Sequence, residues 1–315
     1  NHKVCLPFDL LSEVSDETEI SINVETSFYN SYLEILEIFI KGRSEDEILI
    51  TTYNCHPGLG NDNFSGIIGF FNIYDKISNL KDTHYSYRFA IFPETLGAIC
   101  YIENLSKREI INKVLFSTVL TCLGGHEKNY TFKDSPIKSA YAESYKKELQ
   151  KLIPDLKIYP YSPDGSDERQ FSSPNVSIPS ASLCRNRYYE YEEYHTSLDT
   201  LQYMNKNDVN ETCRYIFKAI RNIDENLRLP KSSAKFGEPF LSSYELDFHS
   251  GGEYNSNSNK SLIINKKITN YLISVANGNR SKEELIDITS EILKVKRKDV
   301  SLVFKKLLEL GILIY

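Results

Sequence analysis

The stretch from Ile48 to Gly66, ILITTYNCHPGLGNDNFSG, constrains the fold more than any other part of the chain. Its first five residues are apolar or β-branched and predict a buried strand. His56 follows where proline and glycine break the chain, and Asp62 comes six residues later, just before apolar residues with helical spacing. An imidazole and a carboxylate at the carboxyl end of a central strand are good zinc ligands. A loop histidine next to a helix-capping aspartate is the alternative, and this stretch leaves both open.

Apolar runs alternate with helical patterns along residues 48–230. Strands are predicted near 48–52, 85–92, 114–123, 156–161 and 176–184, and helices near 64–77, 137–152 and 207–227. This alternation predicts an α/β fold with a mostly parallel central sheet flanked by helices. Residues 1–47 contain two more extended runs, 19–24 and 32–41, which we interpret as lead-in strands left from a longer N-terminal region.

The composition changes after residue 230. Residues 231–260 are rich in Ser, Gly and Asn and are predicted to form a linker. Residues 261–315 predict three helices, 261–276, 281–293 and 297–310, with Ser281 and Glu284 as a capping box and a strand at 312–315. This order of elements predicts a winged-helix-like module. Such modules bind either DNA or protein; DNA binding is not favoured here, and the choice between the two partners stays open.

The net charge, the lengths of the apolar runs and the spacing of the cysteines indicate which partners and which cellular compartment to expect. The chain has 37 basic and 43 acidic residues, a net charge of −6, so nucleic acid is not an expected partner. No apolar run approaches the ~20 residues that cross a bilayer, so no membrane association is expected. The six cysteines are widely spaced and form no C-x-x-C pair, which is typical of reduced cysteines in a cytoplasmic protein.

Three further polar residues follow predicted strands or turns in the same domain. Glu94 lies in PETLG, Asp167 in GSDERQF and His195 in EYHTSLD. Each alone has an ordinary interpretation: a glutamate in a first helical turn, a turn aspartate, or a structural histidine. Together with His56 and Asp62, they are the ingredients of a zinc hydrolase.

The ordered strings CHP-x-x-x-ND-x-x-SG, PET-x-G, TC-x-G, GSDERQF and EYHTSLD resemble the aminopeptidase-like domain found in polysaccharide-biosynthesis gene clusters. That family is related to the co-catalytic zinc aminopeptidases and the glutaminyl cyclases. The resemblance runs from the start of the chain to about Leu227, and it implies the zinc aminopeptidase fold for residues 48–230.

The resemblance also implies a role for each matching residue. His56 would bind one zinc, Asp62 would bridge two zinc ions, Asp167 would be the other ligand of the first zinc, and His195 would bind the second. Glu94 would be the general base. Thr95 departs from the family pattern, because it stands where the aminopeptidases have a glutamate ligand. One or two zinc ions per chain are therefore expected.

These roles imply a zinc-dependent hydrolase of an amide bond, in which zinc activates water and Glu94 accepts its proton. A shift of the alignment by one residue would instead make Glu94 a ligand. The expected substrate is a peptide or an amide-containing small molecule, with amino-sugar derivatives included, and a homo-oligomer stays open. Two other functions are weighed: a degenerate metal-binding scaffold that binds a glycan precursor or partner protein, and a transcription regulator with an enzyme-derived sensor domain.

Overall fold

The computed structural model describes residues 6–15, 17–19, 21–244 and 260–315. The chain divides into two compact units. The first comprises Asn1–Lys138 and Ala142–Glu225, and the second comprises Ser139–Tyr141 and Asn226–Tyr315. Each unit is described separately below.

A seven-stranded sheet forms the centre of the first unit. Its strands, in spatial order, are β1 (Leu36–Ile40), β3 (Ser86–Phe92), β2 (Glu47–Tyr53), β4 (Val114–Val119), β7 (Ser180–Cys184), β5 (Thr131–Lys133) and β6 (Lys157–Tyr159). Four of the six pairings are parallel, and the pairs β1–β3 and β5–β7 are antiparallel. The central strands β2 and β3 are buried along their whole length, as a sheet covered on both faces requires.

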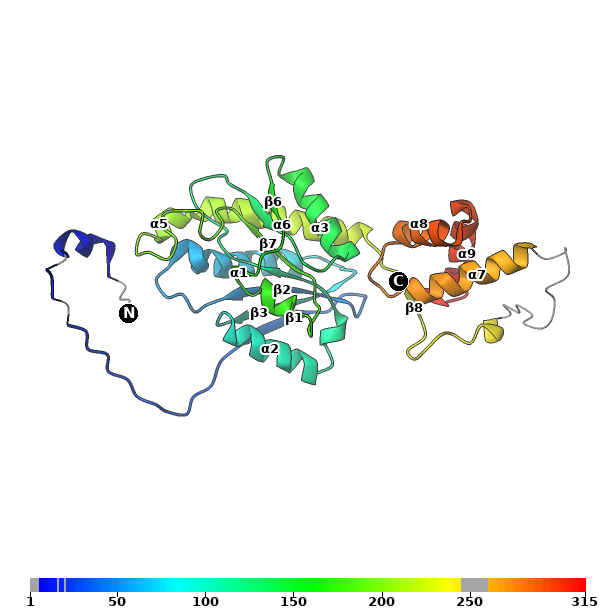
Figure 1. The fold of residues 1–315 in the computed structure, drawn as a ribbon, viewed down its shortest axis with the longest axis horizontal. Coiled ribbons are helices and arrows are strands. Elements are labelled where there is room, and N and C mark those ends of the chain that lie inside the picture. The colour runs from blue at the N-terminus through cyan, green and yellow to red at the C-terminus, as the bar shows by residue number, and fades with distance from the viewer. Residues whose placement is uncertain (1–5, 16, 20, 245–259) are drawn as a thin grey trace. The chain divides into compact units, whose positions relative to one another are not determined.

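Helices cover both faces of this sheet (Figure 1). One face carries α1 (Ser65–Ser78), α3 (Ala140–Leu152) and α6 (Lys206–Asn226), and the other carries α2 (Leu96–Lys107). The short helix α4 (Glu168–Phe171) lies on the same face as α2, because its Phe171 packs in one cluster with Tyr101. Phe70 of α1 meets Phe89 of β3 edge to face with ring centroids 5.4 Å apart. On the opposite face, Tyr101 of α2 packs in one apolar cluster with Leu49 of β2. The α/β architecture predicted from the sequence is therefore confirmed.

Several short elements differ from the sequence prediction. Residues 19 and 21–24, predicted as a strand, are outside any strand in the structure. Strand β5 was not predicted, because three residues are too few to show an alternating pattern. The remaining short elements of this unit are η1 (Phe8–Glu13), η2 (Gly60–Phe64), η3 (Ile111–Lys113) and α5 (Leu201–Met204).

Among its described residues, the second unit contains three α-helices, one short 3-10 helix and a two-stranded antiparallel ribbon. The elements are β8 (Lys231–Ser232), η4 (Leu241–Tyr244), α7 (Lys260–Val275), α8 (Lys282–Leu293), α9 (Arg297–Glu309) and β9 (Leu313–Ile314). The predicted capping box is present, because Glu284 N–H donates to Ser281 Oγ and Ser281 N–H donates to Glu284 Oε2. The predicted linker 231–260 supplies β8, and its residues 245–259 lie outside the described residues. The winged-helix-like assignment stays a prediction.

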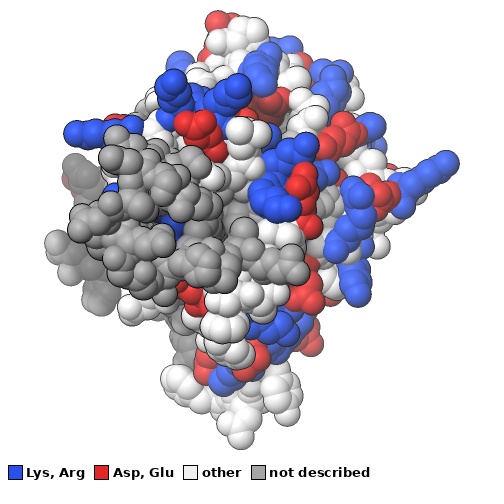
Figure 2. All heavy atoms as spheres, turned by 90° about the vertical axis from the view of Figure 1, so that its right-hand side faces the viewer, with Lys and Arg blue, Asp and Glu red and all other residues white. Residues whose placement is uncertain are grey.

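Basic and acidic side chains lie interspersed on the face of the molecule drawn in Figure 2. In the coloured part of that view, no large area carries one sign of charge alone. Within the described residues, no helix combines the length and the apolar character needed to span a membrane.

Arg88 of β3 links three neighbouring strands. Its guanidinium donates to both oxygens of Glu47 on β2, at 2.6 and 2.9 Å, and lies 2.9 Å from Glu37 Oε1 on β1. Arg88 and Glu47 are each only 4% exposed. A buried carboxylate in this position depends on its cationic partner to offset the lost hydration.

We expect Arg88→Met to destabilise the protein by about 3–5 kcal/mol, because it leaves Glu47 as a buried, unpaired charge. Chemical denaturation followed by circular dichroism measures the change. Arg221→Ala removes an exposed ion pair with Glu225 on α6 and should cost less than about 1 kcal/mol. A loss for Arg88→Met as small as that of Arg221→Ala would contradict the structural role of the buried pair.

Candidate active site

The turn Gly60–Phe64 carries Asp62 next to the carboxyl end of β2. Asp62 is 1% exposed, although it lies in a turn that connects a strand to a helix. Hydrogen bonds from the rest of the unit fix this turn: Gly124 N–H donates to Asn61 Oδ1 at 2.8 Å, and Asn63 Nδ2 donates to Thr52 Oγ1 at 2.9 Å. The turn is therefore held by the sheet beneath it, and Asp62 has a fixed position.

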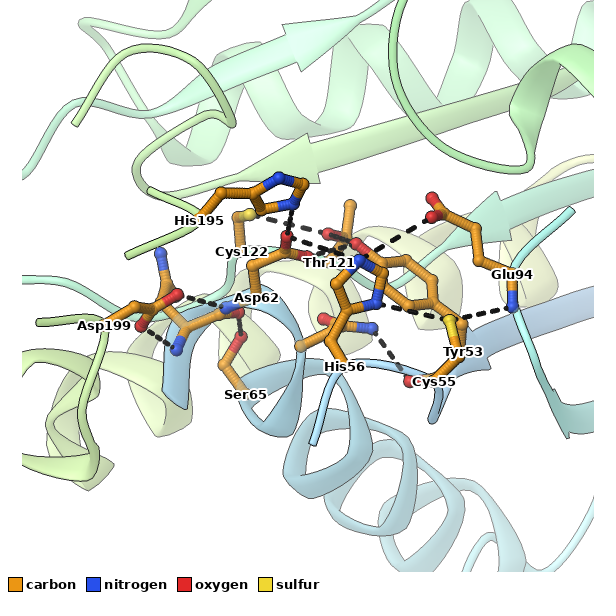
Figure 3. Close-up of polar contacts among 12 residues, drawn as sticks. Tyr53, Cys55, His56, Asp62, Ser65, Glu94, Thr121, Cys122, His195 and Asp199 are labelled. Carbon is orange, nitrogen blue, oxygen red and sulfur yellow. Dashed lines mark hydrogen bonds and ion pairs between the residues drawn. The ribbon is translucent and has the colours of Figure 1, made fainter. Parts of the chain in front are cut away.

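Two histidines meet the Asp62 carboxylate (Figure 3). His195 Nε2 lies 3.0 Å from Asp62 Oδ2, and His56 Nε2 lies 4.0 Å from the same oxygen. One ligand atom from each of the three residues lies within 4.8 Å of the other two. His56 comes from the loop after β2, and His195 comes from the loop after β7. The structure thus brings together three of the four metal ligands expected from the sequence.

Glu94 lies beside this group, just after the end of β3. Its Oε2 is 3.9 Å from His56 Nε2, and Figure 3 shows its carboxylate turned toward that ring. Burial raises the pKa of Glu94 above its ordinary value. Cys55 is exposed: its Sγ lies 3.3 Å from His56 Nδ1 and accepts the N–H of Glu94. This contact leaves His56 Nε2 as the nitrogen available on the side of the carboxylates.

Asp167 lies outside both sets of closely spaced ligand atoms. Its Oδ1 accepts the backbone N–H of Thr95 at 2.8 Å, and its buried Oδ2 has no hydrogen-bond partner among the described residues. Burial raises the pKa of Asp167 to about 7, and the nearby charge of Glu94 acts in the same direction. Its role as a metal ligand stays a prediction. The structure shows that Asp167 is hydrogen-bonded to the backbone of Thr95, the residue next to Glu94.

Asp199 is a site residue that the sequence did not reveal. Its Oδ1 accepts the N–H of Asn61 at 2.6 Å, and its Oδ2 accepts the N–H of Asp62 at 3.0 Å. Tyr191 donates to Asp199 Oδ2 at 3.0 Å. An aspartate just ahead of a helix has the pattern of an ordinary N-cap, and its position four residues after His195 was the only available signal.

A cavity of about 290 Å³ opens beside the ligand group. It is lined by Tyr53, Asp62, Glu94, Thr95, Pro163, Asp164, Gly165, Ser166, Arg169, Tyr188, Tyr189, Tyr194 and His195. Lys133 anchors one wall, because its buried ammonium group donates to the carbonyl of Asp164 and lies 3.9 Å from Glu168 Oε2. Tyr189 is 69% exposed and presents its ring to an incoming molecule.

The fold and these motifs define the class of protein. A family model described as a domain of unknown function (DUF4910) matches residues 12–226, and the chain belongs to this family. A Clostridium acetobutylicum protein, named as a candidate polysaccharide biosynthesis protein with an aminopeptidase-like domain, is 36% identical over 218 residues. That alignment covers 68% of this chain and 48% of the relative, so the chain spans about half of the relative's length. The resemblance inferred from the sequence motifs is confirmed.

Solved structures show the same fold. The crystal structure of a Clostridium acetobutylicum protein named as a candidate peptidase matches with a TM-score of 0.57 and 28% identity, over 89% of this chain and 60% of that one. An aminopeptidase from Aneurinibacillus sp. strain AM-1 matches with a TM-score of 0.51 and 18% identity, over 60% of this chain and 47% of that one. The second likeness is one of fold alone.

We expect Asp199→Ala to destabilise the protein by about 2–4 kcal/mol, because two buried backbone N–H groups lose a charged acceptor. Thermal unfolding measures this loss. Asp82→Ala is the control, since Asp82 is an exposed carboxylate that pairs with Arg43, and its loss should cost less than about 1 kcal/mol. An Asp199→Ala protein as stable as wild type would refute the role of Asp199 in fixing the turn that carries Asp62.

Proposed function

We propose that the protein is a metal-dependent hydrolase of an amide bond in a small molecule. The observation that carries this proposal is the convergence of His56, Asp62 and His195 beside a cavity, with Glu94 3.9 Å from His56. Three protein ligands that leave a position open are typical of a catalytic rather than a structural zinc site. A second acidic group next to such a site is what proton transfer during hydrolysis requires.

The chemistry of the donor groups fits zinc. Two imidazoles and a carboxylate are borderline ligands that suit this ion. The buried Asp167 Oδ2, which has no partner among the described residues, is a further sign that a cationic group belongs in this region. His56, Asp62 and His195 would hold the ion, with Asp167 as a proposed additional ligand. Thr95 offers only a neutral hydroxyl at the position where the resemblance implies a glutamate.

A divalent metal bound here supplies positive charge that makes water more acidic and polarises a carbonyl group. Glu94 accepts the proton of the attacking water as the new C–O bond forms. It then delivers that proton to the nitrogen as the C–N bond breaks, so that acid and amine products leave. Cys55 keeps the Glu94 backbone and the His56 ring together, because it contacts both.

The tyrosines of the cavity favour a substrate with a flat or ring-shaped face. Tyr194 stacks on His195 with ring centroids 4.0 Å apart, and Tyr189 meets Tyr194 at 4.9 Å. This aromatic wall leads from solvent to the ligand group. An amide on an amino sugar matches it, and the polysaccharide-biosynthesis name of the relative supports the same substrate class.

The protein should bind zinc through the histidines named here. We expect His56→Ala to lose zinc on dialysis, and we expect zinc to stabilise wild type by about 2.7 kcal/mol at a hundredfold excess over Kd but not this variant. Elemental analysis and thermal unfolding measure both effects. His126→Ala, in an exposed loop, should behave as wild type. Absence of metal from wild type, even after zinc is added, would overturn the proposal.

Glu94→Gln should keep the metal and lose hydrolysis by about 10²–10⁴-fold, because an amide side chain cannot accept the proton of water. Release of amine from aminoacyl amides and N-acyl amino sugars is the measurement, and Glu192→Gln, an exposed residue outside the cavity lining, is the control. Lower zinc content in Glu94→Gln would instead identify Glu94 as a ligand. Zinc binding by wild type with no turnover of any amide would favour a binding scaffold.

A further inference from the structure

We infer that Tyr53 is a positioning residue that reserves one oxygen of Asp62, so that the site holds a single metal ion on the other oxygen. This inference rests on the proposed function, because it concerns the ion that the ligand group would hold. It assigns a role to a residue outside the set of candidate ligands. It also decides between the one ion and the two ions that the sequence leaves open.

The Tyr53 side chain ends against the Asp62 carboxylate. Tyr53 lies at the end of β2, is 3% exposed, and its hydroxyl donates to Asp62 Oδ1 at 2.5 Å. Thr121 Oγ1 lies 2.7 Å from the same hydroxyl. Because the single phenolic proton goes to the carboxylate, the Tyr53 oxygen accepts from Thr121. The three side chains thus form a directed relay that ends on Oδ1.

The two imidazoles use the opposite oxygen of the same carboxylate. Asp62 Oδ2 lies 3.0 Å from His195 Nε2 and 4.0 Å from His56 Nε2. An ion held by these two nitrogens would therefore take Oδ2 as its carboxylate ligand. A second ion on Oδ1 would face the positive end of the Tyr53 O–H dipole and would lack an imidazole. The arrangement favours one ion with two histidines over two ions bridged by Asp62.

Tyr53 should also set the affinity for that ion. Hydrogen bonds to a ligating carboxylate fix its orientation, and loss of such an outer partner typically weakens metal binding about 10–100-fold. Asp199 already fixes the backbone of Asp62, so the remaining freedom of the carboxylate is rotation of its side chain. The Tyr53 hydroxyl removes this rotation by holding Oδ1.

The test compares Tyr53→Phe with Tyr101→Phe in the full chain. Tyr101 on α2 is a matched control, because it is 2% exposed and its hydroxyl donates to a carboxylate oxygen, Glu37 Oε2, at 2.6 Å. Metal-free protein is titrated with Zn²⁺ by calorimetry in competition with a chelator, and with Co²⁺ by its visible spectrum. Thr121→Val is the second variant at the site, since it perturbs the relay without touching Asp62.

Wild type should bind one equivalent of either metal. Tyr53→Phe should still bind one equivalent, about 10–100-fold more weakly and with a changed Co²⁺ spectrum, whereas Tyr101→Phe should match wild type. Thr121→Val should change in the same direction as Tyr53→Phe, by less. Two equivalents of comparable affinity in wild type, or equal affinity in both Tyr→Phe variants, would overturn the inference and leave the proposed hydrolase intact. A wild type that binds no metal would overturn the proposed function as well.

Discussion

The hydrogen bonds that Asp199 accepts from two consecutive backbone N–H groups fix the turn that carries Asp62, and the geometry of the site depends on them. Asp62 is buried in a turn, and Asp199 fixes that turn by accepting the N–H groups of Asn61 and Asp62. The partners are 137 and 138 residues apart in the chain, so this contact exists only in the folded unit. Neutral groups at the same place would leave the turn weakly held, since charged acceptors form the stronger hydrogen bonds.

The sheet explains why the other site residues arrive at one place. Strands β2, β3 and β7 run in the same direction: β2 pairs with β3, and β4 lies between β2 and β7 and pairs with both. His56, Glu94 and His195 each follow one of these strands, so a common edge receives all three. The cavity opens at this edge, where Asp62, Glu94 and His195 line it. The position of the site is thus a property of strand direction, and its chemistry is a property of the loops.

Sequence patterns predicted the parts of this arrangement that local physics controls. β2 and β3 are long apolar runs, and Ser281 with Glu284 is a local capping motif, so each could be predicted from neighbouring residues. Residues 19–24 alternate in sequence in the same way as a strand, yet the described residues 19 and 21–24 belong to no strand, because pairing depends on the rest of the fold. Asp199 and Tyr53 escaped notice for the same reason. An aspartate ahead of a helix and a tyrosine ending a strand have ordinary local explanations, and only their distant contacts with the Asp62 turn reveal more.

His195 and Asp199 belong to the same loop, residues 185–200 between β7 and α5, and this arrangement has a thermodynamic consequence. One residue supplies an imidazole to the cleft, while the other fixes the turn that supplies the carboxylate. An opening of the loop would therefore remove both contacts with Asp62 at once. Local openings of this kind are seen as amide hydrogen exchange. A ligand that requires the complete site slows exchange in this loop and in the Gly60–Phe64 turn together, while exchange in the strands beneath stays at the rate set by global unfolding.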